Sequence, residues 1–138
     1  MIVTETKIRV YYEDTDQMGV VYYGNYARYY EIGRTEMIRE LGFTYRQMEE
    51  KNIMLPAHSL KINYHKSAYY DDLLTVRTIV DTLPKVKFPI KTEIYNEAGE
   101  LINSGEVVLA FFNSVTNKPC AAPKFFIDEM TRIFNESR

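Results

Sequence analysis

The spacing of apolar residues changes period once along this chain, and that change restricts the fold more than any other feature. From Asn25 to Leu41, apolar or small side chains recur at every third or fourth position, which is the spacing of one helix face. Asn25 is a suitable N-cap and Gly42 a suitable C-terminal stop. The pattern predicts a single long helix of roughly 16 residues.

Five segments alternate apolar with polar residues, as β-strands do: residues 6–12 before the helix and residues 53–66, 73–83, 86–95 and 101–115 after it. In the first segment Ile8, Val10 and Tyr12 are expected to face inward. The later four are expected to form a meander, followed by a short helix over residues 123–135. This order predicts the α+β class, with one helix lying on an antiparallel sheet. A second copy can cover the free sheet edge, so self-association is expected.

Composition narrows the class of protein. A chain of 138 residues is expected to form one domain, here residues 1–138. Its formal net charge of −2 weakens the case for nucleic acid or an anionic membrane as a partner, and no apolar stretch approaches the ~20 residues of a membrane span. Because a secretory signal is not evident and Cys120 is the single cysteine, a reducing, cytoplasmic location is expected.

Residues 11–26 hold the densest cluster of unusual residue types. Asp14 and Asp16 stand next to an apolar run over residues 18–23, and Gly19 and Gly24 permit close backbone approach. One interpretation is a polar loop whose acids turn the chain and favour the helix N-terminus. The other is an active site, in which a carboxylate acts as base or nucleophile while helix N-terminal amides stabilise negative charge.

No metal or organic cofactor is expected. Asp14, Asp16 and Gly19 match part of a calcium-binding loop, but Met18 stands where that loop needs an oxygen ligand and Asn25 where it needs a bidentate carboxylate. The glycines lack the spacing of a phosphate-binding loop. A zinc site is not expected either, because the available histidine and cysteine ligands, His58, His65 and Cys120, include no clustered pair.

Two stretches carry a resemblance to a known family. The first comprises residues 12–16, 19–22, 25–26, 30–31 and 34, and the second comprises residues 64–65 and 68–76. Together they resemble the hotdog-fold acyl-CoA thioesterases, in the 4-hydroxybenzoyl-CoA thioesterase-like (YbgC-type) branch, over about residues 7–130. The resemblance implies a curved five-stranded antiparallel sheet wrapped around one long central helix. It also implies a homodimer or homotetramer (a dimer of dimers) with the active site at a subunit interface.

The resemblance also assigns residues to roles. Asp16 takes the place of the catalytic carboxylate, and the backbone at Tyr23 and Gly24 that of the group that polarises the thioester carbonyl. Asp16 either attacks the carbonyl or deprotonates a water molecule, and both routes stay open. Some relatives have a histidine at the position of Tyr23. The expected substrate-binding residues are Val21, Tyr22, Tyr26, His58 and Ser59.

The expected function is hydrolysis of a small or medium acyl-CoA, or of an acyl-carrier protein thioester, to free acid and thiol. Coenzyme A enters only as part of the substrate. One alternative is a hotdog hydratase or dehydratase; those enzymes pair the aspartate with a histidine five residues later, where this chain has Val21. The other alternative is a module that binds acyl thioesters without catalysis.

Overall fold

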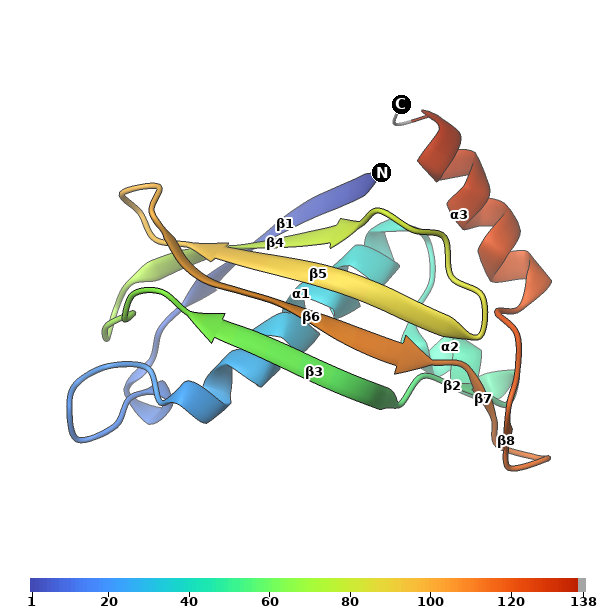
Figure 1. The fold of residues 1–138 in the computed structure, drawn as a ribbon, viewed down its shortest axis with the longest axis horizontal. Helices are drawn as coiled ribbons and strands as arrows, with labels where there is room; N and C mark the ends of the chain where they lie inside the picture. Colours follow the sequence, from blue (N-terminus) through green and yellow to red (C-terminus); the bar gives the residue numbers. More distant parts are fainter. Residues whose placement is uncertain (137–138) are drawn as a thin grey trace.

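The computed structural model describes residues 1–136, in which a five-stranded antiparallel sheet curves around one long helix, α1 (Tyr26–Glu40) (Figure 1). The strand order is β1-β4-β5-β6-β3. These strands are β1 (Ile2–Arg9), β3 (Ala57–Tyr64), β4 (Leu73–Val80), β5 (Lys87–Tyr95) and β6 (Leu101–Ala110). The predicted α+β class, with one helix on an antiparallel sheet, is confirmed.

Short elements connect these parts. Two 3-10 turns, η1 (Tyr12–Asp14) and η2 (Tyr23–Asn25), stand between β1 and α1. The others are α2 (Tyr45–Glu50), α3 (Lys124–Glu136) and a small sheet of β2 (Ile53–Met54), β7 (Phe112–Asn113) and β8 (Lys118–Pro119). The loop before α1 and the helix α3 lie at opposite ends of the sheet (Figure 1).

The helix face predicted from the sequence is the face that α1 buries. Tyr26, Tyr29, Tyr30 and Met37 are all buried, and α1 packs against β1, β4 and β5. Gly33 permits this close approach, because a Cβ there would lie 2.7 Å from the hydroxyl of Thr78. The helix ends as predicted, with Gly42 in the left-handed region at φ 93°.

The predicted four-strand meander is wrong. Strands β4, β5 and β6 do follow one another as a meander, but β3 pairs with β6 instead of β4. The reason is that β1 occupies the edge of β4 over its whole length, from Ile2 opposite Val80 to Arg9 opposite Leu73. Strand β3 therefore forms the opposite edge of the sheet.

Several element boundaries also differ from the prediction; for example, the predicted strand over residues 53–66 divides into β2 and β3. Strand β1 ends at Arg9, so Tyr12 falls in η1 and is 73% exposed instead of facing inward. The chain turns there because the Asp14 carboxylate accepts a hydrogen bond from the Tyr11 amide at 3.0 Å. The predicted strand over residues 101–115 is interrupted at Phe111, which is buried between β6 and β7.

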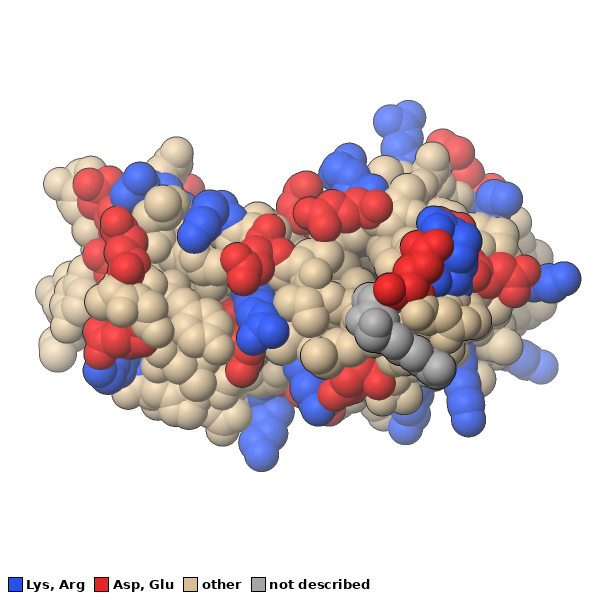
Figure 2. Space-filling model, turned by 90° about the horizontal axis from the view of Figure 1, so that it is seen from above, with Lys and Arg blue, Asp and Glu red and all other residues tan. Residues whose placement is uncertain are grey.

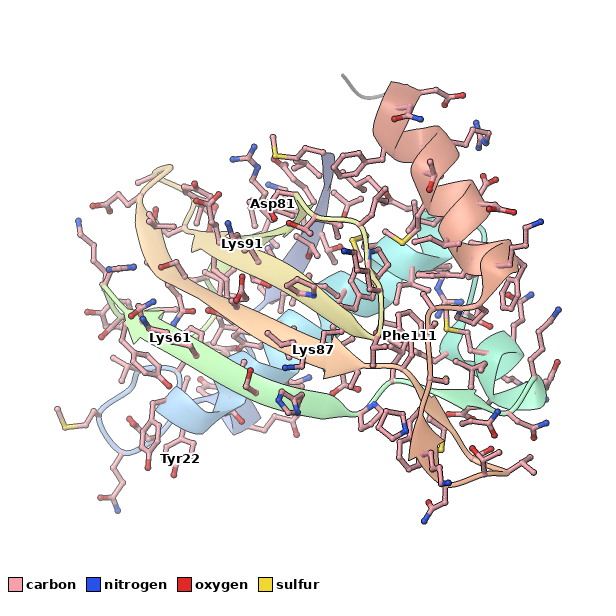
Figure 3. All side chains as sticks on the ribbon, turned by 45° about the vertical axis from the view of Figure 1, so that its right-hand side comes forward. Tyr22, Lys61, Asp81, Lys87, Lys91 and Phe111 are labelled. Carbon is pink, nitrogen blue, oxygen red and sulfur yellow. The ribbon has the colours of Figure 1, made fainter. Side chains whose placement is uncertain are left out.

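Helix α3 closes the end of the core that lies far from the loop before α1. Its Phe126 packs against Phe43, Phe88 and Phe111, with ring centroids 5.2 Å, 5.9 Å and 5.9 Å away. Figure 3 shows Phe111 beyond the end of β6, on the side of α3. This aromatic cluster stabilises the end of the core beside α3, and the loop before α1 lies at the other end.

The surface carries charges of both signs. Figure 2 shows acidic and basic side chains intermingled on the face seen from above, without a large area of a single sign. Among residues 1–136, no helix has the length and apolar character needed to cross a membrane.

Candidate active site

Residues 15–21 form a tight loop that carries Asp16. The Asp16 amide donates to the Val20 carbonyl at 2.9 Å, and the Gly19 amide donates to the Asp16 carbonyl at 3.0 Å. Thr15 and Val21 pair as an isolated antiparallel bridge. Gly19 adopts φ 76°, a conformation that favours glycine. The loop folds back on itself and holds Asp16 at a fixed place near its start.

Asp16 borders a pocket of about 300 Å³. Its Oδ1 accepts a hydrogen bond from the Met18 amide at 2.8 Å, which fixes the carboxylate against its own loop. The remaining lining residues come from the loop, from α1 and from the end of β3 with the segment that follows it; they are Val20, Val21, Tyr23, Tyr26, Tyr64, His65, Lys66 and Ser67.

Turn η2 places the amides of Tyr23 and Gly24 at the start of the helical segment, where helical geometry provides no internal acceptor for them. Each amide shares a rigid peptide plane with the carbonyl before it, so the two groups point in opposite directions. The Tyr22 carbonyl accepts from the Asn25 amide at 2.9 Å, and the Tyr23 carbonyl accepts from the Tyr64 hydroxyl at 3.2 Å. These two bonds therefore fix the directions of the Tyr23 and Gly24 N–H groups.

Asp14 is the buried carboxylate of the loop. Its Oδ1 accepts from Arg28 at 2.6 Å and its Oδ2 from the Tyr11 amide at 3.0 Å. The side chain of Asn25 donates to the Asp14 carbonyl at 2.8 Å. Asn25 stands at the N-cap position of α1 as predicted, but its side chain makes no capping hydrogen bond and donates to the loop instead.

Two lining residues of the pocket, Lys66 and His65, contact charged or polar side chains outside it. Lys66 forms an ion pair with Glu100, and hydrogen bonding to Lys66 is the main reason why the pKa of Glu100 lies below its usual range. The His65 Nε2 lies 2.8 Å from the hydroxyl of Ser104 on β6. Burial raises the pKa of Tyr26, which keeps its hydroxyl neutral beside the pocket.

The structure brings part of the predicted site together. Asp16, Val21, Tyr23 and Tyr26 border one pocket, and Gly24 follows Tyr23 in η2. Tyr22 is exposed and points away from the sheet (Figure 3).

His58 and Ser59 lie in the first half of β3, outside the lining of this pocket within one chain. The lining residues that sequence reasoning did not assign are Val20, Tyr64, His65, Lys66 and Ser67. Val20 belongs to the first stretch of the resemblance and Tyr64 and His65 to the second, whereas Lys66 and Ser67 lie in neither.

Comparison with known proteins identifies the family. The model of the thioesterase-like superfamily matches residues 10–130. The putative acyl-CoA thioesterase YneP of Bacillus subtilis is 41% identical over 101 residues, which cover 73% of each chain. The acyl-CoA thioester hydrolase YbgC of Escherichia coli is 32% identical over 122 residues, covering 88% of this chain and 91% of YbgC. This chain belongs to the thioesterase-like superfamily.

Solved structures agree with this assignment. The DHNA-CoA thioesterase of Staphylococcus aureus superposes with a TM-score of 0.91 and 36% sequence identity, covering 100% of this chain and 97% of that one. An Asp-to-Asn mutant of a 4-hydroxybenzoyl-CoA thioesterase, complexed with 4-hydroxybenzoyl-CoA, shares the fold with a TM-score of 0.83 at 20% identity, covering 92% of this chain and 97% of that one. The hotdog fold expected from the sequence is confirmed.

Proposed function

We propose that this protein hydrolyses the thioester of a small or medium acyl-CoA to the free acid and coenzyme A, with Asp16 as the reacting carboxylate. Family membership supports the reaction class. The observation that carries the role of Asp16 is that it borders the same pocket as Tyr23, the first residue of η2. A thioester carbonyl in this pocket can thus meet a carboxylate and helix N-terminal amides together.

The amides of Tyr23 and Gly24 polarise the carbonyl and receive the negative charge that develops on its oxygen. Such donors matter most for the developing oxyanion, and loss of one donor typically costs ~100–1,000-fold in kcat. Because a thiolate is a good leaving group, the carbon–sulfur bond breaks without a strong general acid in the loop.

Two routes for Asp16 follow from this arrangement. In the first, a carboxylate oxygen attacks the carbonyl carbon, the thiolate leaves, and water hydrolyses the resulting mixed anhydride. In the second, Asp16 takes a proton from water, the water oxygen attacks the carbon, and the proton passes to the departing thiolate. Both routes give one acid and one thiol for each water consumed.

A second copy of the chain is proposed to pair along β3. This strand is a sheet edge over Ala57–Tyr64, and its Leu60 is 45% exposed. Antiparallel pairing about a two-fold axis at the middle of the strand sets the start of one copy opposite the end of the other. The partner subunit's His58 and the partner subunit's Ser59 would then lie near Tyr64 at the pocket. This arrangement supports their predicted substrate-binding role, in a dimer or in a tetramer of two dimers.

The proposal also covers a second candidate substrate, the need for a cofactor and the location of the protein. An acyl-carrier protein thioester is a second candidate substrate with the same reactive group. We propose that the reaction needs no metal or organic cofactor; within the described part of the chain, no cluster of three potential metal-ligating side chains is formed. The single cysteine supports a cytoplasmic location.

The two alternatives have weaker support. A hydratase or dehydratase would need a histidine at position 21, where Val21 is buried and only 4% exposed. A non-catalytic binding module would keep the pocket without using Asp16. A functional test must therefore detect turnover and not only binding.

The test is thiol release from a panel of acyl-CoA esters of different chain length, including aromatic acyl groups, with the purified full chain. We expect release well above the background rate for at least one ester, and the same rate after addition of a chelator. Binding of acyl-CoA without thiol release from any ester would overturn the proposal in favour of the binding module. A chelator-sensitive rate would overturn the proposed metal independence.

A further inference from the structure

Asp14 is the most buried carboxylate of the loop, although it does not border the pocket. Its side chain is 5% exposed, whereas that of its partner Arg28 is 50% exposed. Removing a carboxylate from water costs several kcal/mol in general, and the cost is recovered only where the carboxylate has good partners. Asp14 has two such partners, on different segments of the chain.

The two carboxylate oxygens join the loop to the helix. Oδ2 accepts from the Tyr11 amide at 3.0 Å, at the point where the chain leaves β1. Oδ1 accepts from Arg28 at 2.6 Å, in the first turn of α1. A single side chain thereby connects the start of the loop with the helix that follows it.

The backbone of Asp14 makes a second connection to the same place. Its carbonyl accepts from the Tyr22 amide at 2.9 Å and from the Asn25 side chain at 2.8 Å. Tyr22 precedes η2 and Asn25 ends it. Asp14 therefore contacts both ends of the turn that supplies the Tyr23 and Gly24 amides, and it stands two residues before Asp16.

We propose that the Asp14–Arg28 ion pair positions Asp16 relative to the first amides of η2, and so determines the rate of the chemical step. This inference rests on the proposed function of Asp16. Asp14 is a positioning residue because it contacts neither the pocket nor the reacting atoms. The pair joins the segment that holds the carboxylate to α1, the helix that directly follows the oxyanion donors of η2.

The expected signature is a fall in kcat with little change in KM. Misplacing a reacting group by about 1 Å can cost about 100-fold in rate, whereas the pocket walls that bind substrate contain neither Asp14 nor Arg28. A role confined to folding would lower the melting temperature and the amount of folded enzyme, and it would leave kcat per folded molecule unchanged.

The experiment compares Asp14→Asn, Arg28→Gln, Arg28→Lys and the Asp14→Asn/Arg28→Gln double variant, using an acyl-CoA that the wild type hydrolyses. We expect Asp14→Asn and Arg28→Gln each to lower kcat by roughly 10- to 100-fold. The double variant should be no slower than the slower single variant, because the two groups act as one unit. Arg28→Lys keeps the positive charge and should recover most of the lost kcat.

The matched control is Arg132→Gln, which removes an arginine that pairs with Glu129 and Glu136 on α3, at the other end of the molecule. Its kcat should equal that of the wild type. If Asp14→Asn does not fold, Arg28→Gln decides the matter, since Arg28 is half exposed.

Wild-type kcat in Arg28→Gln and in any folded Asp14→Asn, beside an inactive Asp16→Asn, would overturn this inference and leave the proposed function standing. An active Asp16→Asn would instead overturn the proposed role of Asp16 as the reacting carboxylate, whatever the rate of Asp14→Asn. The two failures are therefore distinguishable.

Discussion

The Tyr64 hydroxyl donates a hydrogen bond to the Tyr23 carbonyl at 3.2 Å, and so joins the edge strand β3 to the first turn of the helical segment. The two residues are 41 positions apart in the sequence. Because the Tyr23 carbonyl and the Gly24 amide belong to one peptide plane, this bond also fixes the direction of a proposed oxyanion donor. The same contact links the proposed active site to the sheet edge on which a second subunit is proposed to bind.

Tyr64→Phe should therefore slow the reaction without unfolding the protein. The change removes one partly exposed hydrogen bond, worth about 1 kcal/mol, and frees the Tyr23–Gly24 peptide to rotate. We expect kcat to fall by roughly 3- to 10-fold, less than for outright loss of an oxyanion donor. Steady-state kinetics measures this change. Tyr95→Phe, on the outer face of β5, is the control and should keep wild-type kcat; equal rates for all three proteins would contradict the proposed orienting role of Tyr64.

Leu60→Asp should separate the proposed subunits. It places a carboxylate on the β3 edge, and in a two-fold pair each carboxylate would lie close to its copy. Val3→Asp is the matched control on the opposite edge strand, β1, where Val3 is 37% exposed. Sedimentation equilibrium should give a multiple of 16.2 kDa for the wild type and Val3→Asp, and a lower mass for Leu60→Asp. A wild-type mass of a single chain would contradict the β3 pairing.

Gly105→Ala should destabilise the fold far more than Gly99→Ala. A Cβ at Gly105 would lie 2.1 Å from the Lys61 carbonyl and 2.7 Å from the Tyr30 hydroxyl, and overpacking of this kind typically costs about 1–3 kcal/mol or more. Gly99 has open space around it, so its cost is limited to its positive φ, about 1 kcal/mol. Urea unfolding measures both changes. Equal midpoints for the two variants would show that β3, β6 and α1 do not approach as closely as described.

The buried tyrosines should make the protein unfold at alkaline pH. Burial is the main cause that raises the pKa of Tyr26, Tyr29, Tyr30 and Tyr45. Below about pH 10 these side chains are neutral in both the folded and the unfolded state, so their contribution to stability is fully present. Above pH 10 they ionise first in the unfolded chain, so the free energy of unfolding falls as the pH rises.

Melting temperatures between about pH 8 and pH 11 measure this effect. In Tyr30→Phe the melting temperature should be lower at pH 8, because the hydrogen bond from Tyr30 to Asn103 is lost. Its further decline above pH 10 should be shallower than that of the wild type, because one titrating group is gone. An equal decline in both proteins would contradict the assigned cause.

Local patterns were sufficient to predict the helix but not the strand order. The buried face of α1, from Tyr26 to Met37, follows from a spacing within one segment. The partner of β3 depends on which strand occupies the edge of β4. That strand is β1, and every residue of β1 pairs with a β4 residue more than sixty positions away in the sequence. No alternation within β3 itself contains this information. The expectation that residues 1–138 form one domain stays a prediction.

The candidate site likewise has one part that the sequence predicts and another that only the folded structure shows. Asp16 and Tyr23 belong to one continuous stretch, so their proximity was predictable. Tyr64 and Lys66 reach the pocket only through the pairing of β3 with β6. The side chain of Asn25 was assigned to helix capping, because a sequence cannot show that the Asp14 carbonyl lies within its reach. Roles that depend on contacts between segments needed the folded structure.

The most direct test of the account is the rate of thiol release by Asp16→Asn, which keeps the shape of the side chain and removes its charge. The Asn side-chain oxygen can still accept from the Met18 amide, so the melting temperature should stay close to that of the wild type. We predict a fall in kcat of roughly 1,000-fold or more, while Asp128→Asn, an exposed position on α3, keeps the wild-type rate. A folded Asp16→Asn that releases thiol at the wild-type rate would contradict the central claim.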